Sequence, residues 1–441
     1  MYKKLIRAFA FSFVPSRLPS RFPVQSRWAM TWFRAAIIAA ACSSILLPAA
    51  ATSQAENVRR GLDLPRSTPA SGDKIAPKLF IFSMFDSEGD VWYRNDSAFD
   101  LLAQNITVPG FSPLFPDVHC TEDGSVCELI TGEGEINAAA TISSLVHSST
   151  FDLAQTYFLI AGIAGGSPKL TSTGSVTFAR FAVQVALQYE IDAREMPSNF
   201  STGYMPQGAR GPDQYPPELY GTEVFELNDD LRQLAFSFAQ KAELYDTPEA
   251  QAYRNNYVNV SQFAAGASAP SFVLCDTATA DTYWIGTMLA EAFENTTSLW
   301  TNGTGVYCTT QQEDNATLEV LMRGAISGLI DFSRIVIMRT VSDVDRPYPG
   351  QTVVEGLFSD QGGAFELSTE NLYRAGVEIV QGILDGWEDQ FKDGVKPSNY
   401  IGDVFGSLGG EPSFGPGSIF HGDRAPSAKR SLRARKQGRS L

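Results

Sequence analysis

Apolar runs of strand length alternate along this chain with longer segments whose apolar residues recur at helical spacing. The strand-like runs are residues 78–85 (KLFIFSMF), 127–131 (CELIT), the first part of 157–170 (YFLIAGIAGGSPKL), 175–187, 271–276 and 334–343. The helix-like segments are residues 135–149, 229–244, 282–300, 316–332 and 369–391, the last predicted to begin at a capping Thr369. Alternating strands and helices indicate an α/β layer fold, and no linker interrupts the pattern, so we predict one domain.

The stretch at 157–170 runs from a strand into a glycine turn, AGIAGGSP, of the kind that often cradles a phosphate group. A phosphate loop would be followed by a Lys-Ser/Thr pair, and a dinucleotide fingerprint needs a third glycine at its own spacing. This turn has neither feature. Its glycines, Gly162, Gly165 and Gly166, therefore call for a different explanation.

The boundaries of the domain follow from composition. Residues 56–76 are polar with Pro and Gly and are predicted to be a linker, and residues 77–405 form the predicted domain. Within it, residues 197–221 are dense in Pro and Gly and are interpreted as a long loop, either a lid or an insertion. Residues 406–441 are rich in Gly, Pro, Ser and then Lys and Arg, so we expect a disordered basic tail.

The distribution of charge excludes nucleic acid as a partner. The first 55 residues hold seven Lys and Arg and no acid, and residues 421–441 hold seven Lys and Arg and one acid. The remaining 365 residues carry 20 basic and 48 acidic side chains, a net charge of −28. A body this acidic repels a phosphate backbone.

The first 55 residues resemble an export signal. An apolar run at 35–47 precedes Pro48 and small residues, so cleavage after Ala51 or Ala55 is expected. The run is 13 residues long, shorter than the ~20 needed to span a bilayer. Residues 30–55 alone form a more ordinary signal, which makes residues 1–29 an upstream extension or a wrong start. The alternative is an uncleaved signal that anchors the protein in the membrane.

Sequons and cysteines also favour a secreted or cell-surface location. Seven N-x-S/T sequons are present; six are predicted to be glycosylated, at Asn95, Asn105, Asn199, Asn259, Asn295 and Asn302. Four cysteines lie beyond the signal region and allow three disulfide pairings, of which we favour Cys120–Cys127 and Cys275–Cys308. The alternative is free buried thiols.

Candidate chemistry lies in carboxylates rather than in histidines or metal ligands. His119, His147 and His421 are the only histidines, none has metal-ligand spacing, and no GxSxG motif is present, so metal and serine hydrolases are disfavoured. Acids follow several strands, at the tip where ligands gather in open α/β sheets. They are Asp86, Glu88 and Asp90, then Asp276, then Asp343 and Asp345. Two carboxyls, one acid and one base, are what cleavage of a glycosidic bond needs.

Four segments together resemble the fungal purine nucleoside permease family, and more distantly the nucleoside phosphorylase and methylthioadenosine nucleosidase superfamily. They are FDSEGD (85–90), TGEGEINAAATISSL (131–145), LIAGIAGGSPKLTSTGSV (159–176) and IMRTVSDVDRP (337–347). In the second segment Glu135 stands where the superfamily usually has Lys. The resemblance covers roughly residues 76–400 and implies a three-layer αβα domain with a central mixed sheet.

The resemblance also implies roles for individual residues. Asp343 corresponds to the aspartate that protonates N7 of the purine, and Glu88 to the acid that activates water, with Asp86 as the alternative. Gly162, Gly165 and Gly166 then bring backbone close to a flat base because they lack a Cβ. Tyr283 and Trp284 either stack on the base or belong to the core.

The ribose ligand stays open between two alignments. One places the superfamily's Met-Glu pair at Met322-Arg323, where the arginine cannot accept from hydroxyls. The other places it at Glu313, Asp314 and Asn315, whose oxygens can, and we prefer it. The sequon at Asn315 would then be shielded from glycosylation.

The resemblance implies purine nucleosides as the ligand and no cofactor or metal. The expected function is nucleoside uptake and metabolism through cleavage of the N-ribosidic bond. Arginine clusters that hold phosphate in the phosphorylases are missing, so water or an alcohol is the expected acceptor. The alternatives are a non-catalytic nucleoside-binding protein that works with a membrane transporter, and a phosphate-dependent phosphorylase. The superfamily also makes a homo-oligomer a candidate assembly.

Overall fold

The computed structural model describes residues 74–415. The predicted export signal at 1–55 lies outside the described residues, and so does the linker at 56–76 up to residue 73. The described body is one unit by its internal contacts.

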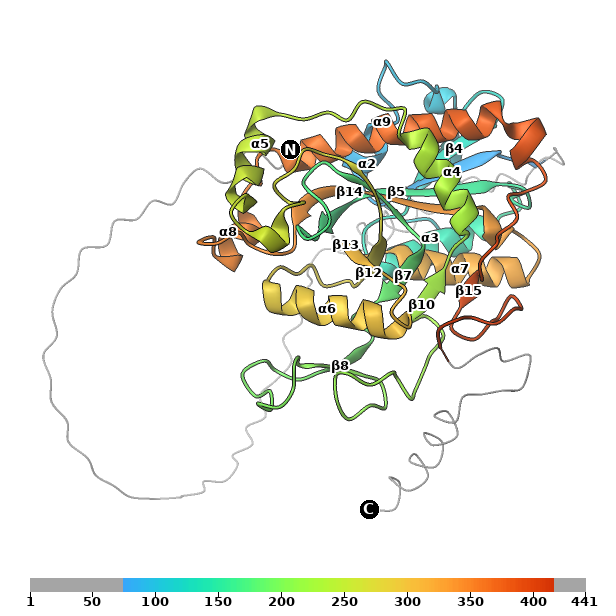
Figure 1. The fold of residues 1–441 in the computed structure, drawn as a ribbon. Helices are drawn as coiled ribbons and strands as arrows, with labels where there is room; N and C mark the ends of the chain where they lie inside the picture. The colour runs from blue at the N-terminus through green and yellow to red at the C-terminus, as the bar shows by residue number, and fades with distance from the viewer. Residues whose placement is uncertain (1–73, 416–441) are drawn as a thin grey trace, which may run out of the picture. The chain divides into compact units, whose positions relative to one another are not determined.

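A mixed sheet of 13 strands forms the centre of the body (Figure 1). Its middle strand is β5 (Tyr157–Gly166), which pairs in parallel with β1 (Leu79–Ser83) and with β14 (Ile335–Val344). β4 (Val126–Ile130) continues the parallel part, and β13 (Tyr307–Gln311) pairs antiparallel with the end of β5. The tips of β5 and β14 therefore lie side by side.

The remaining strands extend the sheet on both sides of this centre. They are β2 (Gln104–Thr107), β3 (Asp117–Cys120), β6 (Val176–Ala179), β7 (Phe181–Gln184), β10 (Val224–Glu226), β11 (Phe272–Leu274), β12 (Asp276–Thr279) and β15 (Gly402–Asp403). A separate two-stranded sheet is made of β8 (Gln188–Glu190) and β9 (Tyr204–Pro206).

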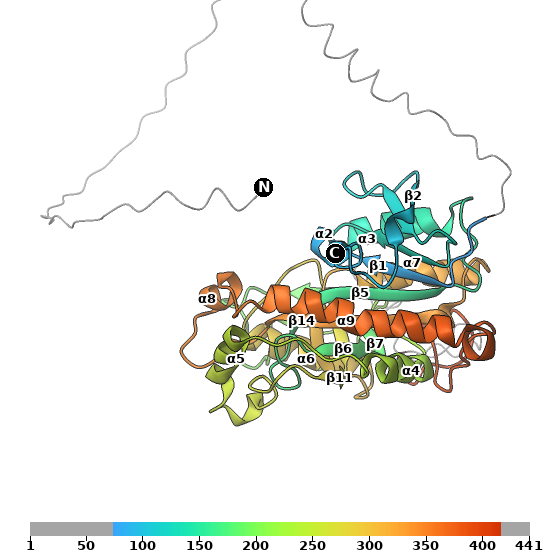
Figure 2. The same cartoon turned by 90° about the horizontal axis from the view of Figure 1, so that it is seen from above.

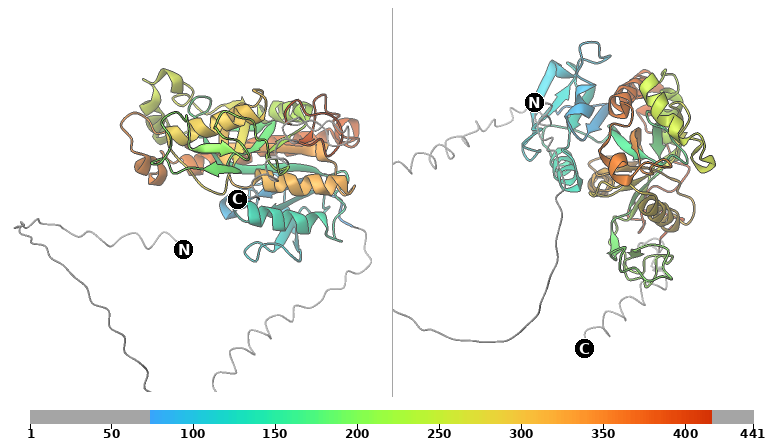
Figure 3. Two further views of the ribbon diagram at one scale, coloured as in Figure 1. Left: turned by 90° about the horizontal axis from the view of Figure 1, so that it is seen from below. Right: turned by 90° about the vertical axis from the view of Figure 1, so that its left-hand side faces the viewer.

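Helices cover both faces of the sheet because β1 and β5 are apolar on both faces. Phe80 and Phe82 point to the face covered by α3 (Glu135–Val146) and α7 (Asp314–Ile326). Leu79 and Ile81 point to the face covered by α4 (Asp229–Ala239) and α9 (Ala364–Asp385). Figures 2 and 3 show the two helix layers with the sheet between them. The predicted three-layer α/β fold with a central mixed sheet is confirmed.

Four shorter or peripheral helices complete the described body: α2 (Asp86–Asp90), α5 (Pro248–Arg254), α6 (Thr287–Trp300) and α8 (Val353–Phe358). Between residues 74 and 415, no helix is both long and apolar enough to cross a membrane.

Several predicted elements differ in their limits from the observed ones. The last long helix begins at Ala364, after Gly363 with a φ of 71°, so Thr369 lies inside the helix and does not cap it. The predicted strand at 175–187 is two strands, β6 and β7. The predicted loop at 197–221 contributes β9. β13 was not predicted, because its sequence YCTTQ places buried polar residues where hydrophobic ones mark a strand.

The ordered body continues into the predicted tail. Residues 406–415 are described, and Phe414 is buried against Phe181 and Tyr400, at centroid distances of 5.5 and 5.9 Å. One aromatic side chain in a Gly/Pro-rich stretch is enough to anchor it. The rest of the predicted tail lies outside the described residues.

The sequons divide as the sequence analysis expected. Asn95, Asn105, Asn199, Asn259, Asn295 and Asn302 are exposed, whereas Asn315 is buried. Asn315 accepts a hydrogen bond from Thr279 Oγ1 at 2.7 Å and donates one to the carbonyl of Thr222 at 2.8 Å. Glycosylation of the six exposed sites stays a prediction.

Two disulfides are present, Cys120–Cys127 and Cys275–Cys308, as favoured among the three pairings. The first joins directly paired residues of β3 and β4. The second links the start of β12 to β13, beside the tip of β5. Disulfides of this kind persist in oxidising compartments.

The two disulfides should differ in their contribution to stability, because they close loops of 7 and 33 residues. The entropy of the unfolded chain predicts losses of about 2 kcal/mol for a Cys120→Ser/Cys127→Ser pair and about 4 kcal/mol for a Cys275→Ser/Cys308→Ser pair. Urea unfolding of both double variants measures this. A larger loss at the shorter loop would contradict the expected order.

Candidate functional site

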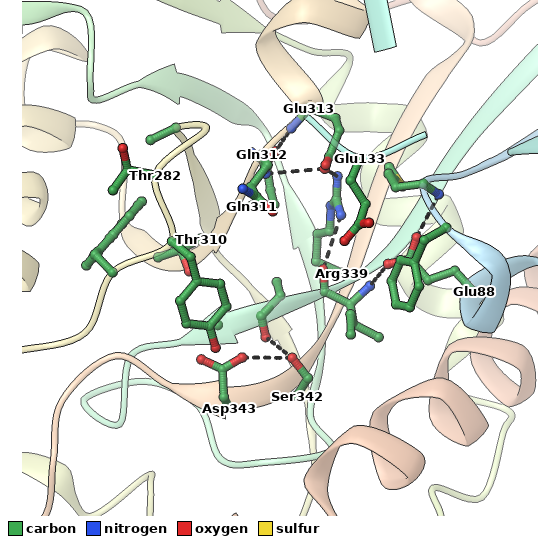
Figure 4. Close-up of a pocket in the computed structure, with 18 of the residues that line it drawn as sticks. Glu88, Glu133, Thr282, Thr310, Gln311, Gln312, Glu313, Arg339, Ser342 and Asp343 are labelled. Carbon is green, nitrogen blue, oxygen red and sulfur yellow. Dashed lines mark hydrogen bonds and ion pairs between the residues drawn. The ribbon is translucent and has the colours of Figure 1, made fainter. Parts of the chain in front are cut away.

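A pocket of about 320 Å³ lies at the tips of β5, β13 and β14. Such a volume is within the ~300–1,000 Å³ of small-molecule sites. Both carboxyls predicted to be catalytic, Glu88 and Asp343, line it (Figure 4). They reach it from different elements, α2 after β1 and the end of β14.

Glu88 is held by two backbone amides. Its carboxylate accepts from the N–H of Met84 at 2.7 Å and from the N–H of Ile163 at 2.6 Å. The side chain is 1% exposed, and burial raises its pKa to about 8 against the opposing influence of Arg339. Asp86, the alternative to Glu88, is exposed and bonds only within its own turn, to the N–H of Ser87. The short α2 helix therefore directs Glu88, and not Asp86, into the pocket.

A β-bulge directs Asp343 into the pocket. The register of β14 on β5 shifts between Val341 and Asp343, so Ser342 and Asp343 both line the pocket, although neighbours in a regular strand point to opposite faces. Asp343 accepts from the Ser342 hydroxyl at 2.8 Å and from Tyr283. Burial raises the pKa of Asp343 above its usual value, and these two hydrogen bonds oppose the rise.

The distance between the two acids along the sheet follows from their contacts with β5. Glu88 bonds to Ile163, and Asp343 is paired with Gly165, two residues further on. Two residues of strand correspond to about 7 Å. In Figure 4 the two side chains lie on opposite sides of the pocket.

A buried arginine, Arg339, lies between these acids and the start of α7. Its Nη2 is 2.5 Å from Asp314 Oδ1 and 3.6 Å from Glu313 Oε2, and its Nη1 donates to the carbonyl of Ile163 at 3.2 Å. Glu313 lines the pocket and also accepts from the N–H of Gly134 at 2.9 Å. Burial raises the pKa of both Glu313 and Asp314, while Arg339 opposes the rise.

The predicted glycines have three different environments. Gly165 lines the pocket, where a Cβ would lie 2.5 Å from Thr310 Oγ1 and 3.1 Å from Asp343 Oδ2. Gly162 lies behind the pocket, where a Cβ would lie 2.5 Å from Arg339 Nη1 and 2.7 Å from Glu88 Oε1. Gly166 contacts Val341 and Thr171. Gly165 alone of the three therefore faces the pocket, and Gly162 makes room for the charged cluster.

The predicted ribose ligands are only partly brought together. Glu313 faces the pocket, but Asp314 pairs with Arg339 beneath it. Asn315 bonds to Thr279 and Thr222, and Met322 is 2% exposed in the core between α7 and the sheet. Asp314, Asn315 and Met322 are therefore occupied by contacts inside the protein. Of the four predicted ribose ligands, Glu313 is the one whose side chain can reach a ligand in the pocket. Tyr283 and Trp284 both line the pocket, and Trp284 also packs on Phe293 at 4.7 Å.

Several lining residues were not predicted. Arg339 and Ser342 belong to the RTVSD segment that predicted Asp343, and Glu133 belongs to the TGEGE segment. A search for polar residues within those segments would have found them. Thr310, Gln311 and Gln312 lie at the end of the unpredicted strand β13, and no sequence signal marks them. Across residues 74–415, no three His, Cys, Asp or Glu side chains converge as a metal ion would require.

Comparison with known proteins identifies the family of the chain. The family model for purine nucleoside permease matches residues 76–396. The chain belongs to the purine nucleoside permease family. The purine nucleoside permease of Candida albicans is 46% identical over 348 residues, covering 78% of this chain and 84% of that protein. A probable purine nucleoside permease of Schizosaccharomyces pombe is 41% identical, covering 70% and 90%.

Among solved structures, a 5′-methylthioadenosine/S-adenosylhomocysteine nucleosidase of Neisseria meningitidis in complex with methylthio-immucillin-A overlaps with a TM-score of 0.42 at 13% identity. The overlap covers 70% of this chain and 99% of that one.

The raised pKa of Glu88 predicts how the free energy of unfolding depends on pH. The carboxyl has a pKa of about 8 when folded against 4.5 ordinarily, so the folded state binds its proton more tightly. Its contribution to stability is therefore complete below about pH 4.5 and is lost as the pH rises to about 8. Relative to Glu88→Gln, the free energy of unfolding of the wild type should fall between pH 5 and 8 by up to ~1.4 kcal/mol per pH unit.

Urea unfolding at a series of pH values checks this. The exposed Asp86→Asn is the matched control, which should run parallel to the wild type. Parallel curves for wild type and Glu88→Gln would show that Glu88 is ionised across this range.

Proposed function

We propose that this protein binds a purine nucleoside in the pocket and cleaves its N-ribosidic bond with water. The observation that carries the proposal is that Glu88 and Asp343 line one cavity from two sides, where they contact β5 at Ile163 and Gly165. An acid and a base at such positions can flank the bond between sugar and base. Membership of the purine nucleoside permease family supports the class of ligand.

Asp343 is the proposed proton donor to the base. The purine leaves with the electron pair of the bond from C1′ to N9, so its ring gains negative charge unless N7 is protonated. A carboxyl with a raised pKa keeps a proton available for that transfer. Ser342, which donates to Asp343, orients the carboxyl.

Glu88 is the proposed base that takes a proton from the attacking water. Two backbone amides fix the orientation of its carboxylate, so a water molecule can approach it from the pocket side. With a pKa of about 8, Glu88 would act as a base mainly at mildly alkaline pH, where the carboxyl is ionised. Glu313, on the same side as Glu88, is the proposed acceptor for the ribose hydroxyls.

Water is the proposed acceptor of the ribosyl group rather than phosphate. Of the described residues that line the pocket, Arg339 alone is cationic, and Asp314 already binds it. A phosphate ion needs donors that are free to bind it, commonly from several arginines. The electrostatics of the pocket therefore disfavour a phosphorylase.

A second candidate is a nucleoside-binding protein that supports transport across a membrane without turnover. The high pKa of Glu88 favours this candidate, because a protonated carboxyl cannot accept a proton from water at neutral pH. Either function fits an exported protein, which we infer from the two disulfides and the six exposed sequons.

The purified protein should release free base from adenosine or guanosine without added phosphate. Asp343→Asn and Glu88→Gln should each lower the rate by ~10²–10⁴-fold, since each removes one proton transfer. Chromatography of the products, with and without phosphate, measures this.

Asp86→Asn, on the same turn as Glu88 but exposed, is the control and should keep wild-type activity. Tight nucleoside binding with no product under any condition would select the transport-binding candidate, and product that forms only with phosphate would select a phosphorylase.

A substitution at Gly165 tests whether the purine base lies against the tip of β5. Gly165→Ala places a methyl group 2.5 Å from Thr310 Oγ1, so we expect weaker nucleoside binding. A Gly165→Ala/Thr310→Ala double variant removes that oxygen and should recover part of the affinity. Isothermal titration with guanosine compares the three proteins, and unchanged affinity in the single variant would place the ligand elsewhere.

A further inference from the structure

The ionisable groups that line the pocket are strongly unbalanced in charge. Four carboxyls line it, those of Glu88, Glu133, Glu313 and Asp343, against the single guanidinium of Arg339. Figure 4 shows Glu88, Glu133 and Glu313 around Arg339 and Asp343 on the other side of the pocket. A ligand in the cavity is therefore bordered by carboxyls on both sides.

Arg339 does not correct this imbalance. Its closest ion pair is with Asp314, which lies beneath the pocket and is fully buried. That pair is neutral as a unit, so the four lining carboxyls have no further cation among the described lining residues. The guanidinium is also held at its other end, where Nη1 donates to the carbonyl of Ile163 at 3.2 Å.

Aromatic rings on the pocket wall reinforce the preference for positive charge. Phe85 and Phe365 line the cavity with ring centroids 6.0 Å apart, and Tyr283 lines it while remaining 55% exposed. The faces of aromatic rings attract cations, most strongly where water is displaced. A flat cationic ring would gain from both the rings and the carboxyls.

We propose, resting on the function proposed above, that this pocket selects nucleosides by charge. It accepts neutral nucleosides, binds nucleosides with a cationic base more tightly, and rejects nucleoside 5′-phosphates. The discriminating groups are the three carboxyls on the Glu88 side, which would meet a 5′-phosphate, and Asp343 with the neighbouring ring of Tyr283, which would meet the base.

The protonation of the carboxyls explains how neutral ligands are also accepted. Burial raises the pKa of Glu88 to about 8, so this carboxyl keeps its proton near neutral pH and the empty pocket carries less negative charge than its composition suggests. A bound cation favours the ionised carboxyls and lowers their pKa values. Binding of a cationic nucleoside should therefore release protons to the buffer, and binding of a neutral one should release fewer.

A cationic base also changes what Asp343 has to do. In 7-methylguanosine the imidazole part of the base already carries the positive charge that protonation of N7 would supply. The bond from C1′ to N9 breaks with its electron pair going to N9, which neutralises the ring. Water forms the new bond to C1′ and gives its proton to Glu88. No proton from Asp343 is needed, so the loss of Asp343 should spare this substrate.

Titration calorimetry of the full chain with guanosine, 7-methylguanosine and guanosine 5′-monophosphate tests the selection. The measurements use mildly acidic buffers, in which the methylated base keeps its charge, with different ionisation enthalpies to count released protons. We expect 7-methylguanosine to bind several-fold more tightly than guanosine and to release more protons. The monophosphate should bind at least ~100-fold more weakly than guanosine, because its phosphate group and the lining carboxyls carry like charges that repel each other.

Glu133→Gln should narrow the gap between guanosine and its monophosphate by roughly two- to fivefold, because this lining carboxyl is exposed and partly screened. Glu195→Gln is the matched control, an exposed acid outside the pocket lining, and should change nothing. Asp343→Asn should lose release of guanine and keep release of 7-methylguanine.

The outcomes separate this inference from the proposed function. Equal binding of the three ligands overturns the selection by charge, whether or not base is released. The expected order of binding without base release supports the selection and overturns the cleavage. If Asp343→Asn releases neither guanine nor 7-methylguanine, while the wild type keeps the expected order of binding, the claim that the cationic substrate does not need Asp343 is overturned.

Discussion

The buried ion pair between Arg339 and Asp314 is the interaction on which the site depends. It joins β14 to the start of α7, where Arg339 is also 3.6 Å from Glu313. Arg339 donates to the carbonyl of Ile163 on β5, and the N–H of Ile163 donates to Glu88 on α2. A buried pair of this kind gives little net stability, but removing one partner leaves an uncompensated charge in the interior and costs several kcal/mol. Loss of Arg339 would leave Glu88, Glu313 and Asp314 facing one another with no counter-charge between them.

The backbone around this pair has been shaped to admit it. Gly162 leaves the space that Arg339 Nη1 and Glu88 Oε1 occupy, and the bulge in β14 places Ser342 and Asp343 on one wall. A regular strand with a side chain at residue 162 would satisfy the sheet equally well and could not hold the cluster. Local departures from strand regularity are therefore explained by the site and not by the fold.

This difference between features that serve the fold and features that serve the site also explains what could be predicted from the sequence. β1, β5 and the first half of β14 are apolar runs because they are buried on both faces, and acids within a few residues of such runs, as at Glu88 and Asp343, stand out. β13 was missed because its Thr and Gln side chains serve the polar pocket. Of the candidate ribose ligands only Glu313 lines the cavity, because neighbours on a helix point in different directions and sequence order alone does not say which one faces the cavity.

Four carboxyls line one cavity, and burying two of them, Glu88 and Glu313, opposes folding, so their position calls for a physical reason. In a purely structural pocket, apolar residues of similar volume would fill the same space at lower cost. Reaction at an N-ribosidic bond supplies a reason, because the ribosyl group becomes cation-like as the base departs, and carboxylates nearby stabilise that charge only at the moment it forms. Until then the pKa of about 8 at Glu88 allows a proton on this carboxyl to take the place of the missing cation. The acidity of the pocket and the protonation of its empty state are thus two consequences of one design, in which the counter-charge to the carboxyls is brought by the substrate rather than by the protein.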